Sequence, residues 1–157
     1  PPAYRVLVGY SLAGLFSLWA GMTQSSTSRQ AACSYQPGAP AAPQLSATAA
    51  SQLNDAPIAT FQRIGAVSGS FWFPGLLDYV DHQLNVGAVG LTHVYLSLGD
   101  REARTPNPQI MHVQENAELL ANKLKNAGIT STFELNRGNH FQNVEGRMKK
   151  ALDWLLK

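Results

Sequence analysis

The chain has 157 residues, of which 45% are hydrophobic, and it carries one cysteine and a formal net charge of +2 at pH 7. This length and composition suit a single domain with a substantial core. The small net charge, without a run of Lys or Arg, argues against binding to nucleic acid or an anionic membrane surface. Because Cys33 is alone, neither an intrachain disulfide nor a cysteine metal cluster can form.

No apolar run approaches the roughly 20 residues that a membrane span needs. No signal peptide is visible either, which favours the cytoplasm. The chain begins at Pro1 without a methionine, so its first residues carry no information about a leader ahead of them.

Residues 4–10 form a short β-rich run, and the very apolar residues 12–20 predict a helix that starts directly after Ser11. A strand, a sharp turn and a buried helix therefore meet at a serine. Residues 22–57 are rich in Ser, Ala, Thr, Gln and Pro and keep neither the helical nor the strand period. We interpret them as a flexible insertion within one domain that spans residues 1–157.

The rest of the chain alternates between short strands and helices. Its apolar pattern predicts strands at 63–69, 92–99 and 130–135 and helices at 74–80, 109–127 and 144–156. The alternation is typical of right-handed βαβ units on a mostly parallel sheet, an α/β fold of three layers. Catalytic groups in such folds gather beyond the carboxyl ends of the strands. Ser11, residues 99–102 and His140 all fall at such ends.

The basic residues near the end of the chain have a simple structural interpretation. Arg147, Lys149, Lys150 and Lys157 fit the C-terminal end of the last predicted helix, where the helix dipole favours cations.

Residues 9–14 read Gly-Tyr-Ser-Leu-Ala-Gly, the G-x-S-x-A-G form of a nucleophile elbow. In such an elbow a serine occupies a strained strand-to-helix turn, and small residues beside it keep the strand and the helix from clashing. The backbone amide of Leu12 would begin the helix and stabilise an oxyanion. On this motif alone, a buried strand-turn-helix with a capping serine is an equally good interpretation.

His140 favours the catalytic interpretation of Ser11. It lies in a glycine-containing loop after the last predicted strand, where a base must lie to reach a serine at another strand end. His82, His93 and His112 fall on predicted helices or strands, and we interpret them as structural or exposed. The histidines show no H-x-x-x-H spacing, so a metal site is a poor alternative.

Two carboxylates follow the strand predicted at 92–99, and either could orient the histidine. Asp100 and Glu102 come one and three residues after Gly99. The commoner form of this turn places the acid three residues after the glycine, which favours Glu102. Asp100 is the alternative acid, and its other possible role is to brace the turn.

Four segments together resemble the esterase D-like and enterochelin esterase-like branch of the α/β-hydrolase superfamily. They are residues 9–18, 63–75, 99–102 and 133–141, and the resemblance covers most of the chain outside 22–57. It implies the C-terminal half of such a domain. It also implies hydrolysis of a carboxylic ester through an acyl-serine intermediate, with Ser11, Glu102 and His140 as the triad.

The resemblance further implies a small-molecule ester as the substrate, and neither a cofactor nor a metal. By the same resemblance, residues 70–73 line the acyl or alcohol pocket, and we expect Tyr10, Phe71 and Trp72 to be pocket residues. From residue chemistry alone, an aromatic side chain in this run fits the core equally well.

Two departures from the family pattern leave rival functions open. The family has strands ahead of its nucleophile strand, which supply one wall of the sheet and a second oxyanion amide. It also does not normally carry a long Ser/Ala/Pro segment after the helix that follows the serine. The rivals are an acyltransferase on the same scaffold and a non-catalytic, truncated or decayed homologue. Without the upstream strands, residues 4–10 would form an exposed edge, which predicts a homo-oligomer.

Overall fold

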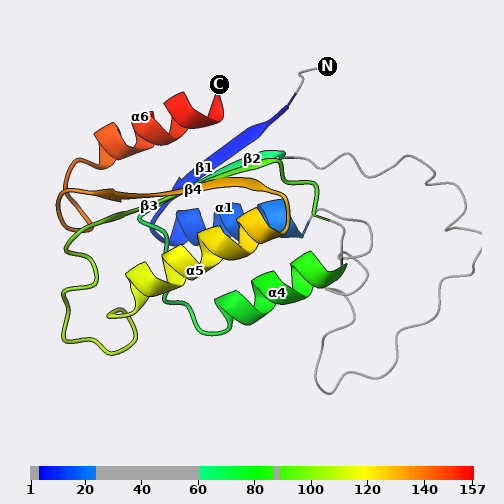
Figure 1. The fold of residues 1–157 in the computed structure, drawn as a ribbon. Coiled ribbons are helices and arrows are strands. Elements are labelled where there is room, and N and C mark those ends of the chain that lie inside the picture. Colours follow the sequence, from blue (N-terminus) through cyan, green and yellow to red (C-terminus); the bar gives the residue numbers. More distant parts are fainter. Residues whose placement is uncertain (1–3, 24–60, 87–88) are drawn as a thin grey trace, which may run out of the picture.

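Four parallel strands form a sheet in the order β1-β2-β3-β4 (Figure 1). The structure is a computed structural model that describes residues 4–23, 61–86 and 89–157. In chain order the elements are β1 (Val6–Tyr10), α1 (Leu12–Met22), β2 (Arg63–Val67), α4 (Leu76–Val86), β3 (His93–Gly99), α5 (Val113–Asn126), β4 (Thr130–Asn136) and α6 (Val144–Leu155). The predicted α/β class, with a parallel sheet between helical layers, is confirmed.

Several predicted element ends are wrong by a few residues, for local reasons. β2 stops at Val67 because Ser68 takes a left-handed backbone conformation with φ 46°. α4 continues to Val86, and α5 begins only at Val113, after a series of turns. Of the predicted insertion at 22–57, Met22 is the last residue of α1 and Thr23 is its C-cap, and the remainder lies outside the described residues.

The helices divide unequally between the two faces of the sheet. α1 and α5 pack on one face with α4 against α5, and α6 packs on the other face across β1, β2 and β3 (Figure 1). Right-handed crossovers between successive parallel strands put their connecting helices on the same face, which explains the common side of α1, α4 and α5. α6 follows the last strand and is free of this constraint.

Alternate residues of the central strands supply two separate parts of the core. The larger part lies under α1, α4 and α5, and its strand residues include Ile64, Ala66, Val94, Leu96 and Leu98. Val67 and Tyr95 point to the other face, where Ala151 and Leu155 of α6 cover them. Because both faces are covered, β2 and β3 are almost continuously apolar, as in other buried parallel sheets.

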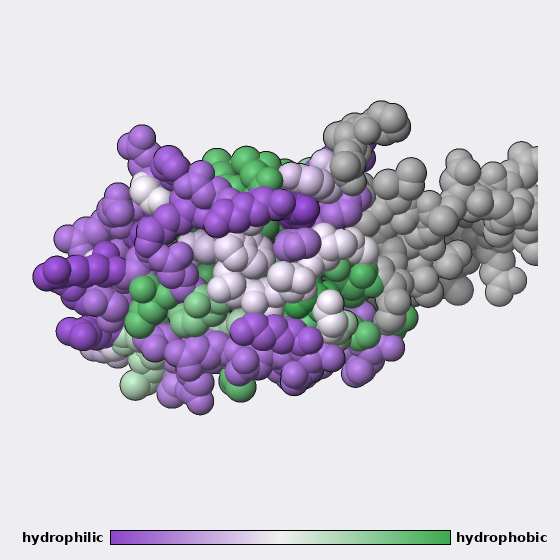
Figure 2. All heavy atoms as spheres, turned by 45° about the horizontal axis from the view of Figure 1, so that its top comes forward, coloured by the Kyte–Doolittle hydropathy of each residue, from purple (hydrophilic) through white to green (hydrophobic). Residues whose placement is uncertain are grey.

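The surface on the side of α6 is mostly hydrophilic, and its hydrophobic side chains gather in smaller areas (Figure 2). None of the helices in the described ranges is long and apolar enough to cross a membrane.

β1 and α1 approach each other closely at two glycines. A Cβ at Gly9 would lie 2.0 Å from the Ala13 carbonyl oxygen, and a Cβ at Gly14 would lie 3.1 Å from the Gly9 carbonyl oxygen. The atom that opposes Gly9 belongs to the helix backbone, so it cannot move aside by a change of rotamer. The absence of a side chain at Gly9 therefore lets α1 begin at Leu12, only one residue after the end of the strand.

Replacing Gly9 with alanine should destabilise the fold by at least the roughly 1–3 kcal/mol that overpacking costs, because the added methyl group meets backbone. Gly128→Ala is the matched control: Gly128 has φ 81° and open space around a Cβ, so the cost there is that of a left-handed alanine, about 1–2 kcal/mol. Urea unfolding of both variants measures the difference. A smaller loss for Gly9→Ala than for Gly128→Ala would contradict the close-approach explanation.

Candidate active site

The carboxyl ends of the four strands meet at one edge of the sheet, and polar residues follow each strand. Ser11 follows β1, Ser68 follows β2, Glu102 lies in the turn after β3, and His140 lies in the loop after β4. β4 is at one side of the sheet, whereas α6 packs over β1, β2 and β3. The chain between them must therefore travel back along this edge, which carries His140 from β4 to the end of β1.

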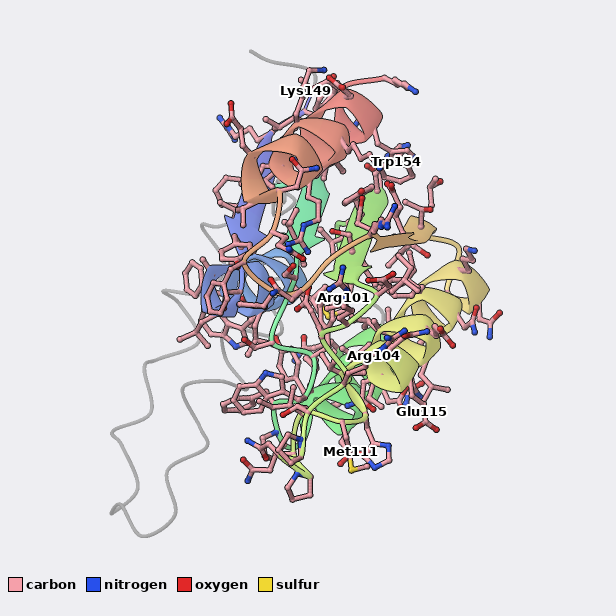
Figure 3. The ribbon with its side chains drawn as sticks, turned by 90° about the vertical axis from the view of Figure 1, so that its left-hand side faces the viewer. Arg101, Arg104, Met111, Glu115, Lys149 and Trp154 are labelled. Carbon is pink, nitrogen blue, oxygen red and sulfur yellow. The ribbon has the colours of Figure 1, made fainter. Side chains whose placement is uncertain are left out.

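Figure 3 views the molecule from the side on which the strands end. The segment that follows β3, marked by Arg101 and Arg104, is seen between α6, marked by Lys149 and Trp154, and the start of α5, marked by Glu115. The segment that follows β3 is thus seen between the two helical layers in this view.

Ser11 is held in a strained backbone conformation between β1 and α1. Its φ of 58° and ψ of −124° lie in a region that residues with a side chain rarely adopt. The Ser11 N–H donates to the Val67 carbonyl at 3.0 Å, and its own carbonyl accepts from the Gly14 and Ser70 N–H groups at 3.0 and 3.2 Å. These bonds to β2, to α1 and to the turn after β2 fix the strained residue from three sides.

His140 contacts both other candidate residues. Its Nε2 lies 3.0 Å from Ser11 Oγ, and its Nδ1 lies 2.8 Å from Glu102 Oε2. Since an ionised carboxylate only accepts hydrogen bonds, we assign the ring proton to Nδ1, which leaves Nε2 to accept the Ser11 hydroxyl proton. The ring packs against Tyr10 and Phe141, with ring centroids 5.0 Å apart in each case.

The two carboxylates after β3 have different partners. Glu102 reaches the imidazole, whereas Asp100 Oδ1 accepts a hydrogen bond from the Gly138 N–H at 2.8 Å. Asp100 therefore ties the turn after β3 to the loop that carries His140. Of the two acids that the sequence left open, Glu102 is the one in contact with the base.

Glu102 is a buried carboxylate, with 5% of its side chain exposed. Its Oε1 accepts hydrogen bonds from the Ser68 hydroxyl at 2.7 Å and from the Gly99 N–H at 2.5 Å. Burial raises the pKa of this carboxyl, but the hydrogen bonds from His140, Gly99 and Ser68 outweigh it and hold the pKa below its ordinary value. The group is therefore ionised at neutral pH and able to orient the imidazole.

A cavity of about 330 Å³ opens at Ser11 and His140. Its other lining residues are Ser68, Gly69, Ser70, Trp72, Glu102, Thr105, Ile110, Val113 and Phe141. This lining combines hydroxyl, carboxylate and imidazole groups with aliphatic and aromatic side chains, so the cavity suits a small molecule with both polar and apolar parts. Within the described residues, no group of three or more His, Cys, Asp or Glu is placed to hold a metal ion.

Of the three residues expected in the pocket, Trp72 lines the cavity, and the other two lie elsewhere. The expectation for Phe71 is wrong: its side chain is fully buried in the larger core cluster. The cause is the tight turn after β2, where the Phe71 N–H donates to the Gly69 carbonyl at 2.7 Å and the aromatic ring folds back against Gly69. Tyr10 is not among the lining residues either, because its ring packs on His140 and its hydroxyl donates to the His140 carbonyl at 2.5 Å.

The interpretation of Arg147 as a cation at the end of a helix is also wrong. Arg147 lies near the start of α6 with 1% of its side chain exposed, and its guanidinium donates to Ser68 Oγ and Glu102 Oε1. Sequence reasoning missed both Arg147 and Ser68 as residues of this region. The spacing of Arg147 from Ala151 and Leu155, four and eight residues on, was the available signal, because it places the arginine on the apolar face of the helix.

A larger apolar cavity, of about 450 Å³, lies between α1 and the start of α4. Leu12, Phe16, Trp19 and Phe73 are among its lining residues, and Ser11, Glu102 and His140 are not. The smaller cavity, which contains all three of these polar residues, is therefore the candidate active site.

The parallel sheet and its two helical layers, with a serine at the turn between β1 and α1, define an α/β-hydrolase fold. Two solved structures share it: an IroE-like serine hydrolase from Shewanella oneidensis (TM-score 0.59, 14% identity) and the siderophore hydrolase EstA from Aspergillus nidulans (TM-score 0.58, 17% identity).

The matches cover 94% and 98% of this chain but only 38% and 48% of the two hydrolase chains, respectively. At this level of identity the likeness shows the fold alone. No protein-family model matches the sequence, and no curated protein is significantly similar to it.

The lowered pKa of Glu102 predicts how stability depends on pH. Folding favours the ionised form of Glu102, so the ionised carboxylate adds to the free energy of unfolding at pH values above its unfolded pKa of about 4.3. This stabilisation is lost as the pH falls through the lower pKa of the folded state. At neutral pH, Glu102→Gln should cost about 3–5 kcal/mol, because it leaves buried Arg147 without its carboxylate. As the pH is lowered from about 5, the difference in the free energy of unfolding between the wild type and Glu102→Gln should shrink.

Urea unfolding at a series of pH values from 7 downward measures this difference. Glu145→Gln is the control, since Glu145 lies exposed on the same helix as Arg147, and its curve should stay parallel to that of the wild type. A constant gap between Glu102→Gln and the wild type would mean that the Glu102 pKa is not lowered by folding.

Proposed function

We propose that this protein is a carboxylic ester hydrolase that acts through an acyl-serine intermediate. The observation that carries the proposal is the double contact of His140, with Ser11 Oγ at 3.0 Å on one ring nitrogen and Glu102 Oε2 at 2.8 Å on the other. A nucleophile, a base and an orienting acid in this order are what acyl transfer to serine requires. The serine hydrolase and siderophore hydrolase among the structural neighbours add support.

In the proposed reaction, Ser11 Oγ attacks the ester carbonyl carbon while His140 Nε2 takes the hydroxyl proton. The tetrahedral intermediate collapses, the carbon–oxygen bond of the ester breaks, and His140 returns the proton to the departing alcohol. Water then attacks the acyl-serine with His140 again as base, which releases the carboxylic acid and restores Ser11. Glu102 holds the Nδ1–H tautomer and stabilises the imidazolium that forms in each half-reaction.

The Leu12 backbone amide is the oxyanion donor in this proposal. Leu12 is the first residue of α1, and the first N–H groups of a helix have no intrahelical acceptor. The strained φ of Ser11 supports its role as the nucleophile of an elbow, in which the amide of the next residue, here Leu12, is an oxyanion donor. The positive end of the α1 dipole adds to the stabilisation of a developing negative charge.

The proposed substrate is a small-molecule ester that fits the 330 Å³ cavity. Trp72, Ile110 and Phe141 offer it an apolar wall beside Ser11. The same acyl-serine could be captured by an alcohol instead of water. Analysis of the products formed in the presence of a competing alcohol separates a hydrolase from an acyltransferase.

Ser11 should be the serine that a fluorophosphonate probe labels in the intact protein. Ser11→Ala should abolish the labelling and lower kcat for a p-nitrophenyl ester by about 10⁴-fold or more. Mass spectrometry of the labelled peptide identifies the residue. Ser17→Ala is the matched control, because Ser17 lies on α1, directly after the Ser11 turn, with its hydroxyl bonded to the Ala13 carbonyl, and it does not line the cavity with His140.

Labelling of another serine, or full turnover in Ser11→Ala, would overturn the assignment. A well-folded wild-type protein that neither reacts with the probe nor hydrolyses esters would favour the non-catalytic homologue instead.

We also propose that the isolated 157-residue chain forms homo-oligomers. Among the described strands β1 is hydrogen-bonded on one side only, to β2, and such an edge is a template for pairing with another chain. Sedimentation of this chain should show species larger than the monomer. A monodisperse monomer at micromolar concentration would contradict the proposal.

A further inference from the structure

Arg147 is a buried cation that the proposed reaction does not use. It lies near the start of α6, and 1% of its side chain is exposed. A charge at this depth costs several kcal/mol unless partners replace the lost water. Solubility explains a cation on the surface of a protein, but it does not explain an arginine on the apolar face of this helix.

The partners of Arg147 come from three segments of the candidate active site. Its Nη1 donates to Ser68 Oγ at 2.6 Å and to Glu102 Oε1 at 3.0 Å. Its Nη2 donates to the carbonyl oxygens of Asn139, His140 and Gln142 at 3.0, 2.9 and 2.6 Å. One planar guanidinium thus joins the end of β2, the acid after β3 and the loop that carries the base.

The two oxygens of Glu102 have separate tasks in this arrangement. Oε2 faces His140 Nδ1, and Oε1 is held by Arg147, Ser68 and Gly99. The orientation of the carboxylate, and hence the direction in which it holds the imidazole, is set on the Oε1 side. Arg147 also fixes the main chain of His140 itself, so both ends of the Glu102–His140 contact depend on the same group.

We propose that Arg147 is the positioning residue of this site: it aligns Glu102 and the 139–142 turn so that His140 Nε2 meets Ser11 Oγ. This inference rests on the proposed function. Arg147 is not among the residues that line the cavity, so it acts through Glu102 and the loop and does not contact substrate. A lysine cannot take its place, because an ammonium group lacks the rigid fork of donors that spans a carboxylate and three carbonyls at once.

The kinetic test compares Arg147→Met and Arg147→Lys with Lys149→Met in the intact protein, with p-nitrophenyl acetate as substrate. Lys149 is the matched control, since it lies on the same helix with 74% of its side chain exposed and forms an ion pair with Asp153 on the surface. Both Arg147 variants should lose about 10²-fold in kcat with KM changed little, and Lys149→Met should behave as wild type. An Arg147→Met protein with wild-type kcat would overturn the proposal.

Chemical rescue separates positioning from a general loss of folding. Arg147→Ala should regain part of its kcat when guanidinium chloride is added at concentrations well below those that unfold the wild type, and not when sodium chloride is added at equal ionic strength. The readout is therefore the kcat that guanidinium restores to Arg147→Ala, and it applies whether or not this variant folds without the additive. Rescue by sodium chloride to the same extent would show that only ionic strength matters.

A proton spectrum gives a readout that does not depend on turnover. The His140 Nδ1 proton, shared with Glu102 at a 2.8 Å separation, should give a far-downfield signal that is absent in His140→Gln. The signal should be lost or shifted in Arg147→Lys and unchanged in Lys149→Met. If the wild type shows this pattern of signals but is inactive, only the proposed function is refuted. If the wild type is active and its Arg147 variants keep both the signal and kcat, only the role of Arg147 is refuted.

Discussion

A buried negative charge is the constraint on which the rest of the site depends. Glu102 has lost almost all contact with water, and an unpaired carboxylate at that depth would take up a proton. It stays ionised because donors from Gly99, Ser68, His140 and Arg147 surround its two oxygens. These donors belong to three different strand ends and one helix, so the charge is stable only when the sheet is fully assembled. Folding and the formation of the site are therefore one event.

The topology explains how distant segments of chain come to share one carboxylate. The crossovers from β1 to β4 lead the chain steadily away from Ser11, and α6 then lies on the opposite face and over the earlier strands. The loop between β4 and α6 must retrace the width of the sheet along its carboxyl edge. This return brings His140 to Ser11 and buries the Arg147 side chain against the loop. The change of face by the last helix thus closes the site.

Local patterns in the sequence were sufficient for part of this arrangement. Ser11 and His140 could be identified because each directly follows a strand that is recognisable from its own residues, and the spacing from Gly99 favoured Glu102 over Asp100. Burial that depends on a turn could not be foreseen: the tight turn at Gly69 and Phe71 puts Phe71 into the core, while Trp72 borders the cavity. The role of Arg147 depends on partners that lie 45 and 79 residues away, which no local pattern reveals.

The left-handed backbone at Ser11 places stability and reactivity in conflict at one position. A residue with a side chain at φ 58° and ψ −124° carries a strain of about 1–3 kcal/mol, which a glycine would relieve. Glycine has no hydroxyl, so the more stable protein would lack the nucleophile of the proposed reaction. Under the proposed function, selection for turnover and selection for folding act in opposite directions on residue 11. A descendant released from the first pressure is expected to drift toward glycine at this turn and to become more stable as it becomes inert.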